Sequence, residues 1–264
     1  MSDCPPSRAE YVTVHGHRVW HEVHGTTGEP VVLLHGGFAG ASSWAAQIPA
    51  LAAAGLRVYV PERRGHAHTP DVEGPITYAL MAADTIGYLE SVVGGPAHLV
   101  GWSDGAVVAA LVALRRPALS ARMVLIGQYY NSEGRVAGSP LDQLLHSPEA
   151  MGFLRALYDP YSPDGPEHFP IVYEKMLAMI DSEPEIELSE LSRITASTLV
   201  VQGDRDLVTL QHSAAIAAAL PNGRLAVLPG SHALPLELPE VVNALLTTFL
   251  QRGAPEPLWS PPPA

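Results

Sequence analysis

The sequence has little cysteine and few positive charges. A single cysteine, Cys4, stands among its 264 residues, which excludes an intrachain disulfide and a zinc site built from several cysteines. Lysine and arginine together number 15 against 27 aspartates and glutamates, so the net charge is −12. Because nucleic acids and anionic membrane surfaces are bound by clusters of basic groups, this balance argues against both as partners.

Long hydrophobic runs are also missing. No apolar stretch approaches the roughly 20 residues that a membrane helix needs, and the N-terminal MSDCPPSRAEY lacks the charged and apolar regions of a signal peptide. We therefore expect a cytoplasmic protein. Hydrophobic residues are nevertheless plentiful, at 47% of the chain, which is enough for one sizeable α/β core.

Short apolar runs predict a parallel sheet. PVVLLHGG contains four apolar residues in succession, which is typical of a strand buried on both faces. The same pattern recurs at residues 57–60, 97–101, 122–127, 197–203 and 224–230. Residues 11–15 and 18–24 alternate on either side of Gly16 and predict an antiparallel hairpin.

Helical patterns separate most of these strands. Thr77 can cap a helix that Gly94 and Gly95 stop, and Pro239 opens a last helix. Buried strands that alternate with helices predict an α/β fold with a twisted, mostly parallel sheet of about eight strands flanked by helices.

The alternation breaks once. Residues 128–194 contain helical stretches, loops and the acidic run DSEPEIELSE, but no buried strand. We therefore predict a small helical cap at 128–194, inserted into a core formed by residues 1–127 and 195–252. The proline-rich tail, 253–264, is expected not to pack on the core.

The strand at 97–101 runs into GWSDG, and a helical pattern follows directly. This succession predicts a nucleophile elbow, in which Ser103 sits on a strained turn and Gly101 and Gly105 allow the backbone to approach closely. The N-terminus of the helix then faces the serine and favours a developing negative charge. The structural alternative is a tight turn whose serine only caps the helix.

A serine nucleophile needs a histidine and an acid, which follow it in the order acid, then histidine. His232 lies in the loop after the last predicted strand, and Asp204 and Asp206 lie in the loop after the strand before it. We predict Asp206 as the acid and Asp204 as a turn-forming residue, because a position slightly further from the strand can reach the imidazole. Glu133, after the preceding strand, is the other candidate acid.

The loop HGGFAG after the strand at 31–34 is built of small residues, so its backbone can approach a substrate oxygen. We predict an oxyanion hole made by the N–H of Gly37, with Phe38 as the second candidate, and the N–H of Asp104. His35 is interpreted as a structural hydrogen-bonding residue beneath this loop.

Side chains next to these motifs are predicted to line the substrate pocket: Phe38, Trp102, Asp104 and Tyr129. A plain core role fits the three aromatic residues equally well. For Asp104 the alternative is a polar residue at a helix start, where its carboxylate interacts with the helix dipole.

HGG, GWSDG, GDRD and GSH stand in this order, each after a predicted buried strand. Together they resemble the α/β-hydrolase superfamily over essentially the whole core. GWSDG, GDRDLV and GSHALP are most similar to the biphenyl hydrolase-like, or valacyclovir hydrolase, group and its bacterial esterase relatives. PERRGHAHTPD is similar to a loop of small bacterial members in which an Arg-Gly-His turn shapes the active-site rim. The chain departs from the valacyclovir-hydrolase type at HGGF and in the cap.

The resemblance implies the α/β-hydrolase fold and a serine hydrolase that cleaves small-molecule carboxylic esters with Ser103, His232 and Asp206. It calls for no metal or organic cofactor. It also implies that Asp104 holds the α-amino group of amino-acid esters. The same catalytic residues serve lactonases, thioesterases and carbon–carbon bond hydrolases, and the same fold serves catalytically idle receptors of small ligands. The sequence gives no indication of the oligomeric state.

Overall fold

The structure is a computed structural model that describes residues 6–136, 138, 147–253 and 255, apart from the side chain of Ala150. Cys4, residues 137 and 139–146 of the predicted cap, and the predicted tail other than Gly253 and Pro255 lie outside the described residues. Within the described part of the chain, no helix is long and apolar enough to cross a membrane.

Eight strands form one sheet: β1 Arg8–Val14, β2 His17–His24, β3 Pro30–Leu34, β4 Arg57–Pro61, β5 Ala97–Trp102, β6 Ser120–Ile126, β7 Ser197–Gly203 and β8 Gly223–Leu228. Their order in the sheet is β1-β2-β4-β3-β5-β6-β7-β8. β1 and β2 form the predicted antiparallel hairpin, β2 runs antiparallel to β4, and the remaining pairs are parallel. The predicted mostly parallel sheet is confirmed.

The order of the strands reverses at one place in the sheet. From β3 the chain crosses to β4 on one side and then to β5 on the other, so β3 and β5 lie side by side at the reversal. In open α/β sheets ligands bind at such a point, outside the carboxyl ends of the strands. HGGFAG follows β3 and GWSDG overlaps the end of β5, so both motifs are carried to this place.

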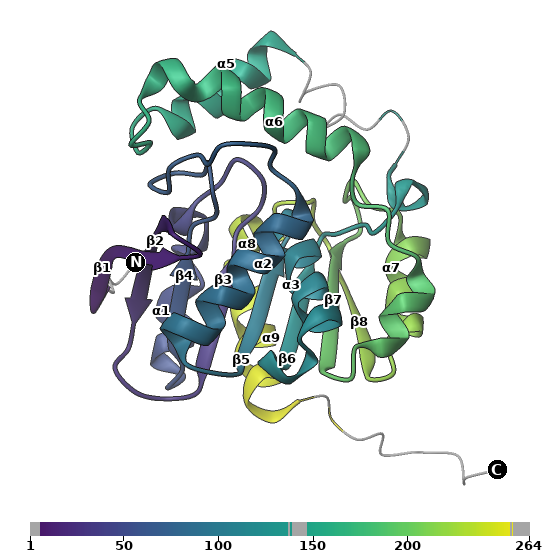
Figure 1. Ribbon diagram of the computed structural model, residues 1–264. Coiled ribbons are helices and arrows are strands. Elements are labelled where there is room, and N and C mark those ends of the chain that lie inside the picture. The colour runs from purple at the N-terminus through teal and green to yellow at the C-terminus, as the bar shows by residue number, and fades with distance from the viewer. Residues whose placement is uncertain (1–5, 137, 139–146, 254, 256–264) are drawn as a thin grey trace, which may run out of the picture.

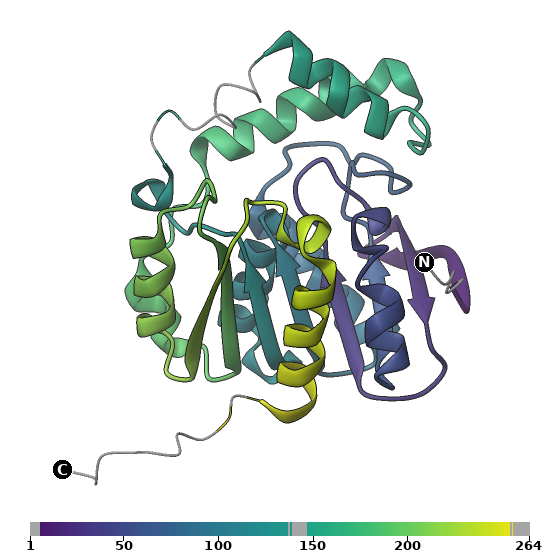
Figure 2. The same ribbon diagram turned by 180° about the vertical axis from the view of Figure 1, so that it is seen from behind.

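Helices cover both faces of the sheet: α1 Ile48–Ala53, α2 Tyr78–Tyr88, α3 Asp104–Arg115, α7 Leu210–Ala219, α8 Leu234–Glu237 and α9 Pro239–Arg252. α2, α3 and α7 lie on one face, and α1 and α9 lie on the other (Figures 1 and 2). Thr77 caps α2 as predicted, since its hydroxyl accepts the N–H of Leu80 at 3.1 Å.

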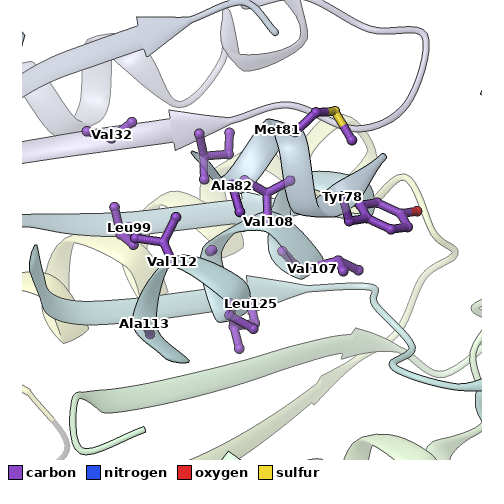
Figure 3. Packing of buried hydrophobic residues seen from close by; sticks show 14 of the residues in the cluster. Val32, Tyr78, Met81, Ala82, Leu99, Val107, Val108, Val112, Ala113 and Leu125 are labelled. Carbon is purple, nitrogen blue, oxygen red and sulfur yellow. The ribbon is translucent and has the colours of Figure 1, made fainter. Parts of the chain in front are cut away.

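Each face has its own hydrophobic cluster. On the α2–α3 face, valines of α3 such as Val108 and Val112 pack over Val32 of β3 and Leu99 of β5 (Figure 3). Alanines and valines make up most of the buried face of α3, and such small side chains let the helix lie close to the sheet. This packing fixes the N-terminus of α3, and with it the corner at Ser103, relative to β5.

Two further helices lie across the carboxyl ends of the strands: α5 Pro148–Tyr158 and α6 Phe169–Ser182 (Figure 1). An ion pair joins Lys175 of α6 to Asp71 of the loop that follows β4, with 2.6 Å between Nζ and Oδ2. His168, just before α6, contacts the same carboxylate at 2.9 Å. α5 and α6 therefore cover the end of the sheet at which the reversal of strand order lies, and α6 is tied to the core beneath it.

The last strand differs from its prediction. The apolar run at 224–230 predicts a strand buried on both faces, but β8 stands at the edge of the sheet, next to β7. Leu225 and Val227 are 40% and 45% exposed, so this prediction is wrong. An edge strand is covered on fewer sides than a central one, and a run of apolar residues does not reveal the place of its strand in the sheet.

Candidate active site

Ser103 sits on a tight corner between β5 and α3. Its backbone dihedrals are φ 56° and ψ −123°, a region that L-residues rarely adopt. A Cβ on Gly101 would collide with the backbone of Gly105 and Ala106, and a Cβ on Gly105 would collide with the carbonyl of Leu34. The glycines of GWSDG are therefore required by close backbone packing on both sides of the serine.

Asp206 and His232 meet after β7 and β8. The Nδ1–H of His232 donates to Oδ1 of Asp206 at 2.7 Å, and the Asp206 side chain is only 1% exposed. The same carboxylate oxygen accepts the N–H of Leu207 at 2.6 Å. With its proton on Nδ1, the neutral imidazole leaves Nε2 free to accept one. The indole N–H of Trp102 donates to the carbonyl of His232 at 2.8 Å and holds this loop beside β5.

The other two candidate acids lie elsewhere. Asp204 is exposed, and its Oδ1 accepts the N–H of Gly230 at 2.9 Å, which links the loops after β7 and β8. Glu133 is exposed in the short turn Ser132–Gly134. Of the three acids that the sequence offers, Asp206 is the one in contact with the imidazole.

Ser103 and His232 line the same pocket, of about 200 Å³. The described residues show no hydrogen bond between the Ser103 hydroxyl and the imidazole, and in ligand-free hydrolases this contact is often long and tightens when substrate binds. All four predicted lining residues border the pocket, and the remaining side chains around it are mostly apolar: Ala39, Leu154, Ile180, Leu207 and Val208. Arg135 also reaches this pocket, and sequence analysis did not predict it.

Backbone donors border the pocket as well. Gly37, Phe38 and Asp104 all line it, and no acceptor within the described residues takes their N–H groups. Asp104 begins α3, where the first N–H groups of a helix have no intrahelical partner. Phe38 has φ 57°, so the loop after β3 turns sharply at this residue. The loop and the helix therefore supply N–H groups on two sides of Ser103.

The carboxylate of Asp104 is largely buried, at 8% exposure. Its Oδ1 accepts the Tyr78 hydroxyl at 2.7 Å, while its Oδ2 is buried without a hydrogen-bond partner. A Cβ on Gly37 would lie 2.5 Å from Oδ2, so the glycine loop passes directly over this oxygen. Asp104 thus contacts the loop after β3 as well as the pocket.

Gly127, at the end of β6, is a residue of the site that sequence analysis did not single out. It has φ 60°, and a Cβ there would lie 3.0 Å from Oδ2 of Asp206 and 3.0 Å from Nδ1 of His232. The glycine leaves the space that the His232–Asp206 pair occupies. A glycine directly after the apolar run MVLI was the available signal.

Gly127→Ala is expected to push the His232–Asp206 pair out of position and to lower kcat by about 10- to 100-fold. The matched control is Gly74→Ala, because Gly74 also has a positive φ, of 94°, but nothing lies near its Cβ position. Both variants should lose stability from backbone strain. Measurement of kcat and Tm separates the two effects, and equal kcat values for the two variants would contradict this role of Gly127.

Buried histidines lie beneath the glycine loop. The rings of His35 and His66 are 5.0 Å apart, and both side chains are buried. Burial lowers the pKa of His66 from 6.5 to about 3. Burial, followed by the charge of Arg63, holds the pKa of His35 well below 6.5. Both imidazoles are therefore neutral in the folded protein at neutral pH.

The protein should lose stability in mild acid for this reason. As the pH falls below 6.5, the unfolded chain binds protons that the buried imidazoles do not, and for His66 this difference persists until its folded pKa of about 3 is reached. His66 alone is expected to lower the free energy of unfolding by about 2 kcal/mol at pH 5. Denaturant unfolding at pH 7 and pH 5 should show a smaller loss in His66→Gln, and an equal loss in both proteins would contradict this assignment.

Within the described residues, no group of three or more histidine, cysteine, aspartate or glutamate side chains is arranged to hold a metal ion. The groups that surround the pocket are instead a hydroxyl, an imidazole paired with a carboxylate, and backbone N–H donors. This set can perform nucleophilic attack with proton transfer and can stabilise an oxyanion.

Comparison with known proteins matches residues 31–245 to the alpha/beta hydrolase family. The putative non-heme bromoperoxidase BpoC of Mycobacterium tuberculosis is 29% identical over 255 residues, covering 84% of this chain and 94% of that protein. Human serine hydrolase BPHL is 28% identical over 202 residues, covering 72% and 67%. A thermophilic esterase from Thermogutta terrifontis, at 25% identity, superposes with a TM-score of 0.70 over 94% of this chain and 99% of that one.

BPHL is thus a distant relative among several hydrolases, and a special closeness to its group stays a prediction. The family model extends from β3 into α9 and includes the segments that carry Ser103, Asp206 and His232. With the model spanning most of the sequence and the fold in agreement with it, the chain belongs to the alpha/beta hydrolase family.

Proposed function

We propose that the protein is a serine hydrolase that cleaves carboxylic esters of small molecules through an acyl-enzyme on Ser103. The observation that carries this proposal is the 2.7 Å hydrogen bond between His232 and Asp206 beside the pocket that Ser103 lines. A serine nucleophile needs a base that takes its proton and an acid that orients that base.

In the proposed reaction, Nε2 of His232 takes the hydroxyl proton as Ser103 Oγ attacks the ester carbonyl carbon. Asp206 keeps the imidazole in the required tautomer and offsets its positive charge. The tetrahedral intermediate collapses, its bond to the alcohol oxygen breaks, and His232 gives the proton to the leaving alcohol. His232 then activates a water that releases the acid from Ser103 by the reverse sequence.

The negative charge on the carbonyl oxygen would be received by backbone N–H groups. Asp104 at the start of α3 supplies one donor, and the loop after β3 supplies the other from Gly37 or Phe38. Such a donor acts most strongly when it is already in place before charge develops, and loss of one donor commonly costs about 10²- to 10³-fold in kcat.

The pocket favours a small acyl group without charge. Its volume is about 200 Å³, and apolar side chains from the core and from the helices above it make up most of its wall. Desolvating an apolar acyl group in such a pocket is favourable, whereas burying a charged group needs a partner of opposite charge.

A substrate amine is the alternative ligand for Asp104, as the likeness to the valacyclovir-hydrolase group implies. The unpartnered Oδ2 favours this role, and the hydrogen bond from Tyr78 to Oδ1 shows that part of the carboxylate is already engaged. Turnover of an aminoacyl ester and of its N-acetylated form by Asp104→Asn distinguishes an amine anchor from a structural carboxylate.

The proposed bond specificity is tested by steady-state kinetics on a panel of substrates whose acyl groups are small and matched as closely as possible. The panel contains a p-nitrophenyl ester, a thioester, a lactone, an aminoacyl ester and, for carbon–carbon cleavage, a vinylogous diketone. Protein with Ser103→Ala provides the blank for each substrate. We expect kcat/KM to be highest for the simple ester. A preference of tenfold or more for the thioester, the lactone or the diketone would overturn the ester assignment, and no turnover of any substrate would favour a ligand receptor.

A further inference from the structure

Arg63 is a buried arginine directly beneath the loop after β3. Its side chain is 5% exposed, and its guanidinium donates to two successive backbone carbonyls of that loop. Nη1 donates to the carbonyl of His35 at 2.5 Å, and Nη2 donates to the carbonyl of Gly36 at 3.0 Å. The planar fork of an arginine suits two acceptors held side by side, which a lysine ammonium cannot reproduce.

His35 contributes to the same arrangement. The backbone N–H of Arg63 donates to Nε2 of His35 at 3.1 Å, so the ring proton must lie on Nδ1. Nδ1–H then donates to the carbonyl of Gly36 at 2.8 Å. The Gly36 carbonyl is therefore held by a guanidinium and by a neutral imidazole, in addition to a longer hydrogen bond of 3.4 Å from the backbone N–H of Ala39.

The direction of the Gly36 carbonyl determines where the next N–H points. The carbonyl of Gly36 and the N–H of Gly37 belong to one planar trans peptide unit, in which the two groups point in opposite directions. With the carbonyl turned down toward Arg63, the N–H of Gly37 is turned away from Arg63. Gly37 lines the pocket, and nothing in the described residues accepts its N–H.

A buried guanidinium also needs a negative charge nearby. No direct ion pair joins Arg63 to Asp104 among the described residues, but the two side chains flank one peptide unit: Arg63 donates to the Gly36 carbonyl, and a Cβ on Gly37 would lie 2.5 Å from Oδ2 of Asp104. Burial lowers the pKa of Arg63 from 12.5 to about 10, and the carboxylate of Asp104 opposes this change. The guanidinium therefore stays protonated at neutral pH. Asp104 in turn places a carboxylate close to the predicted oxyanion hole, where alone it would repel the developing charge. The positive charge of Arg63 offsets that repulsion.

We propose that Arg63 is the positioning residue of the oxyanion hole: it fixes the Gly36 carbonyl, so that Gly37 rather than Phe38 presents its N–H to the substrate oxygen, and Asp104 is its counter-ion. The proposal rests on the serine-hydrolase function proposed above. It also gives Asp104 a role that requires no amine on the substrate.

The test compares wild type, Arg63→Lys and the matched control Arg64→Lys. Arg64 is the neighbouring buried arginine, but its guanidinium pairs with Asp84 at 2.8 and 2.9 Å, away from the glycine loop. Active sites are first titrated with a fluorophosphonate, so that kcat refers to folded, reactive protein. The affinity of a trifluoromethyl ketone, whose adduct with serine carries an oxyanion, is measured in parallel with kcat and KM.

Arg63→Lys should lower kcat per titrated site by about 10- to 100-fold, while KM changes by less than about threefold. The affinity for the trifluoromethyl ketone should fall by about the same factor as kcat. Arg64→Lys should lower Tm but leave kcat per site and the ketone affinity unchanged. Unchanged kcat and ketone affinity in Arg63→Lys would overturn the proposal. If the fluorophosphonate does not react with the wild-type protein, the serine-hydrolase function itself would be overturned.

Asp104→Asn supplies a second readout if Arg63→Lys does not fold. Asparagine can keep the hydrogen bond from Tyr78 while it removes the charge. The ratio of kcat/KM for an aminoacyl ester to that for its N-acetylated form should stay within about twofold of the wild-type ratio, and Tm should fall. A loss of tenfold or more in kcat/KM for the aminoacyl ester, with no such loss for its N-acetylated form, would overturn the counter-ion role and support the amine anchor.

Discussion

Ser103→Ala is expected to lower kcat/KM by about 10⁴- to 10⁶-fold on whichever ester the protein turns over, because the attacking oxygen is removed while the rest of the pocket remains. Activity that survives would come from binding and from the oxyanion hole. The measurement is steady-state turnover of a p-nitrophenyl ester with substrate in excess, corrected for spontaneous hydrolysis.

Folding of this variant can be checked independently. Alanine keeps the strained backbone that serine adopts at φ 56°, so Tm should stay close to that of the wild type. Ser103→Gly should be more stable than both, since glycine adopts positive φ without a steric cost. A folded Ser103→Ala protein that keeps more than about a tenth of the wild-type kcat/KM would rule out Ser103 as the nucleophile.

Asp206→Asn should have the second largest effect, a loss of about 10⁴-fold in kcat. An asparagine amide can donate to Nδ1 of His232, which places the ring proton on Nε2 and blocks it as a base. The imidazole would keep its place but have the wrong tautomer. KM should change little, because Asp206 is buried behind His232 and does not line the pocket.

Asp204→Asn is the matched control for this prediction. Asp204 lies in the same loop, two residues earlier, but is exposed, and among the described contacts its side chain bonds only to the backbone N–H of Gly230. An asparagine oxygen can accept the same bond, so kcat should stay within about threefold of the wild type. Comparable losses in the two variants, or a larger loss in Asp204→Asn, would contradict the assignment of the acid.

The periodicity of the sequence predicted the strands well because parallel strands are buried on both faces. PVVLLHGG and RMVLIG are recognisable for that reason, and both form central strands. β8 has a similar run of residues but lies at the edge, with Leu225 and Val227 exposed. Apolar content indicates that a strand exists, while its burial depends on its neighbours in space.

The residues that the structure brings together around Ser103 were predictable to different degrees. Ser103, Asp206 and His232 stand at fixed places relative to strand ends, so their order along the chain was informative. Gly127 acts through close packing against the His232–Asp206 pair. Arg63 acts through hydrogen bonds to two carbonyls of another loop. Such contacts join segments far apart in the chain, and the polar sequence PERRGHAHTPD gives no sign that an arginine within it is buried.

The central claim is that His232 and Asp206 make Ser103 a reactive nucleophile. It is tested most directly by treating the folded protein with a fluorophosphonate and mapping the modified peptide by mass spectrometry. We expect a single adduct, on Ser103, formed at a rate that falls by at least about 10³-fold in His232→Gln. Absence of an adduct on Ser103 in the folded wild type, or an equal labelling rate in the two proteins, would contradict the claim.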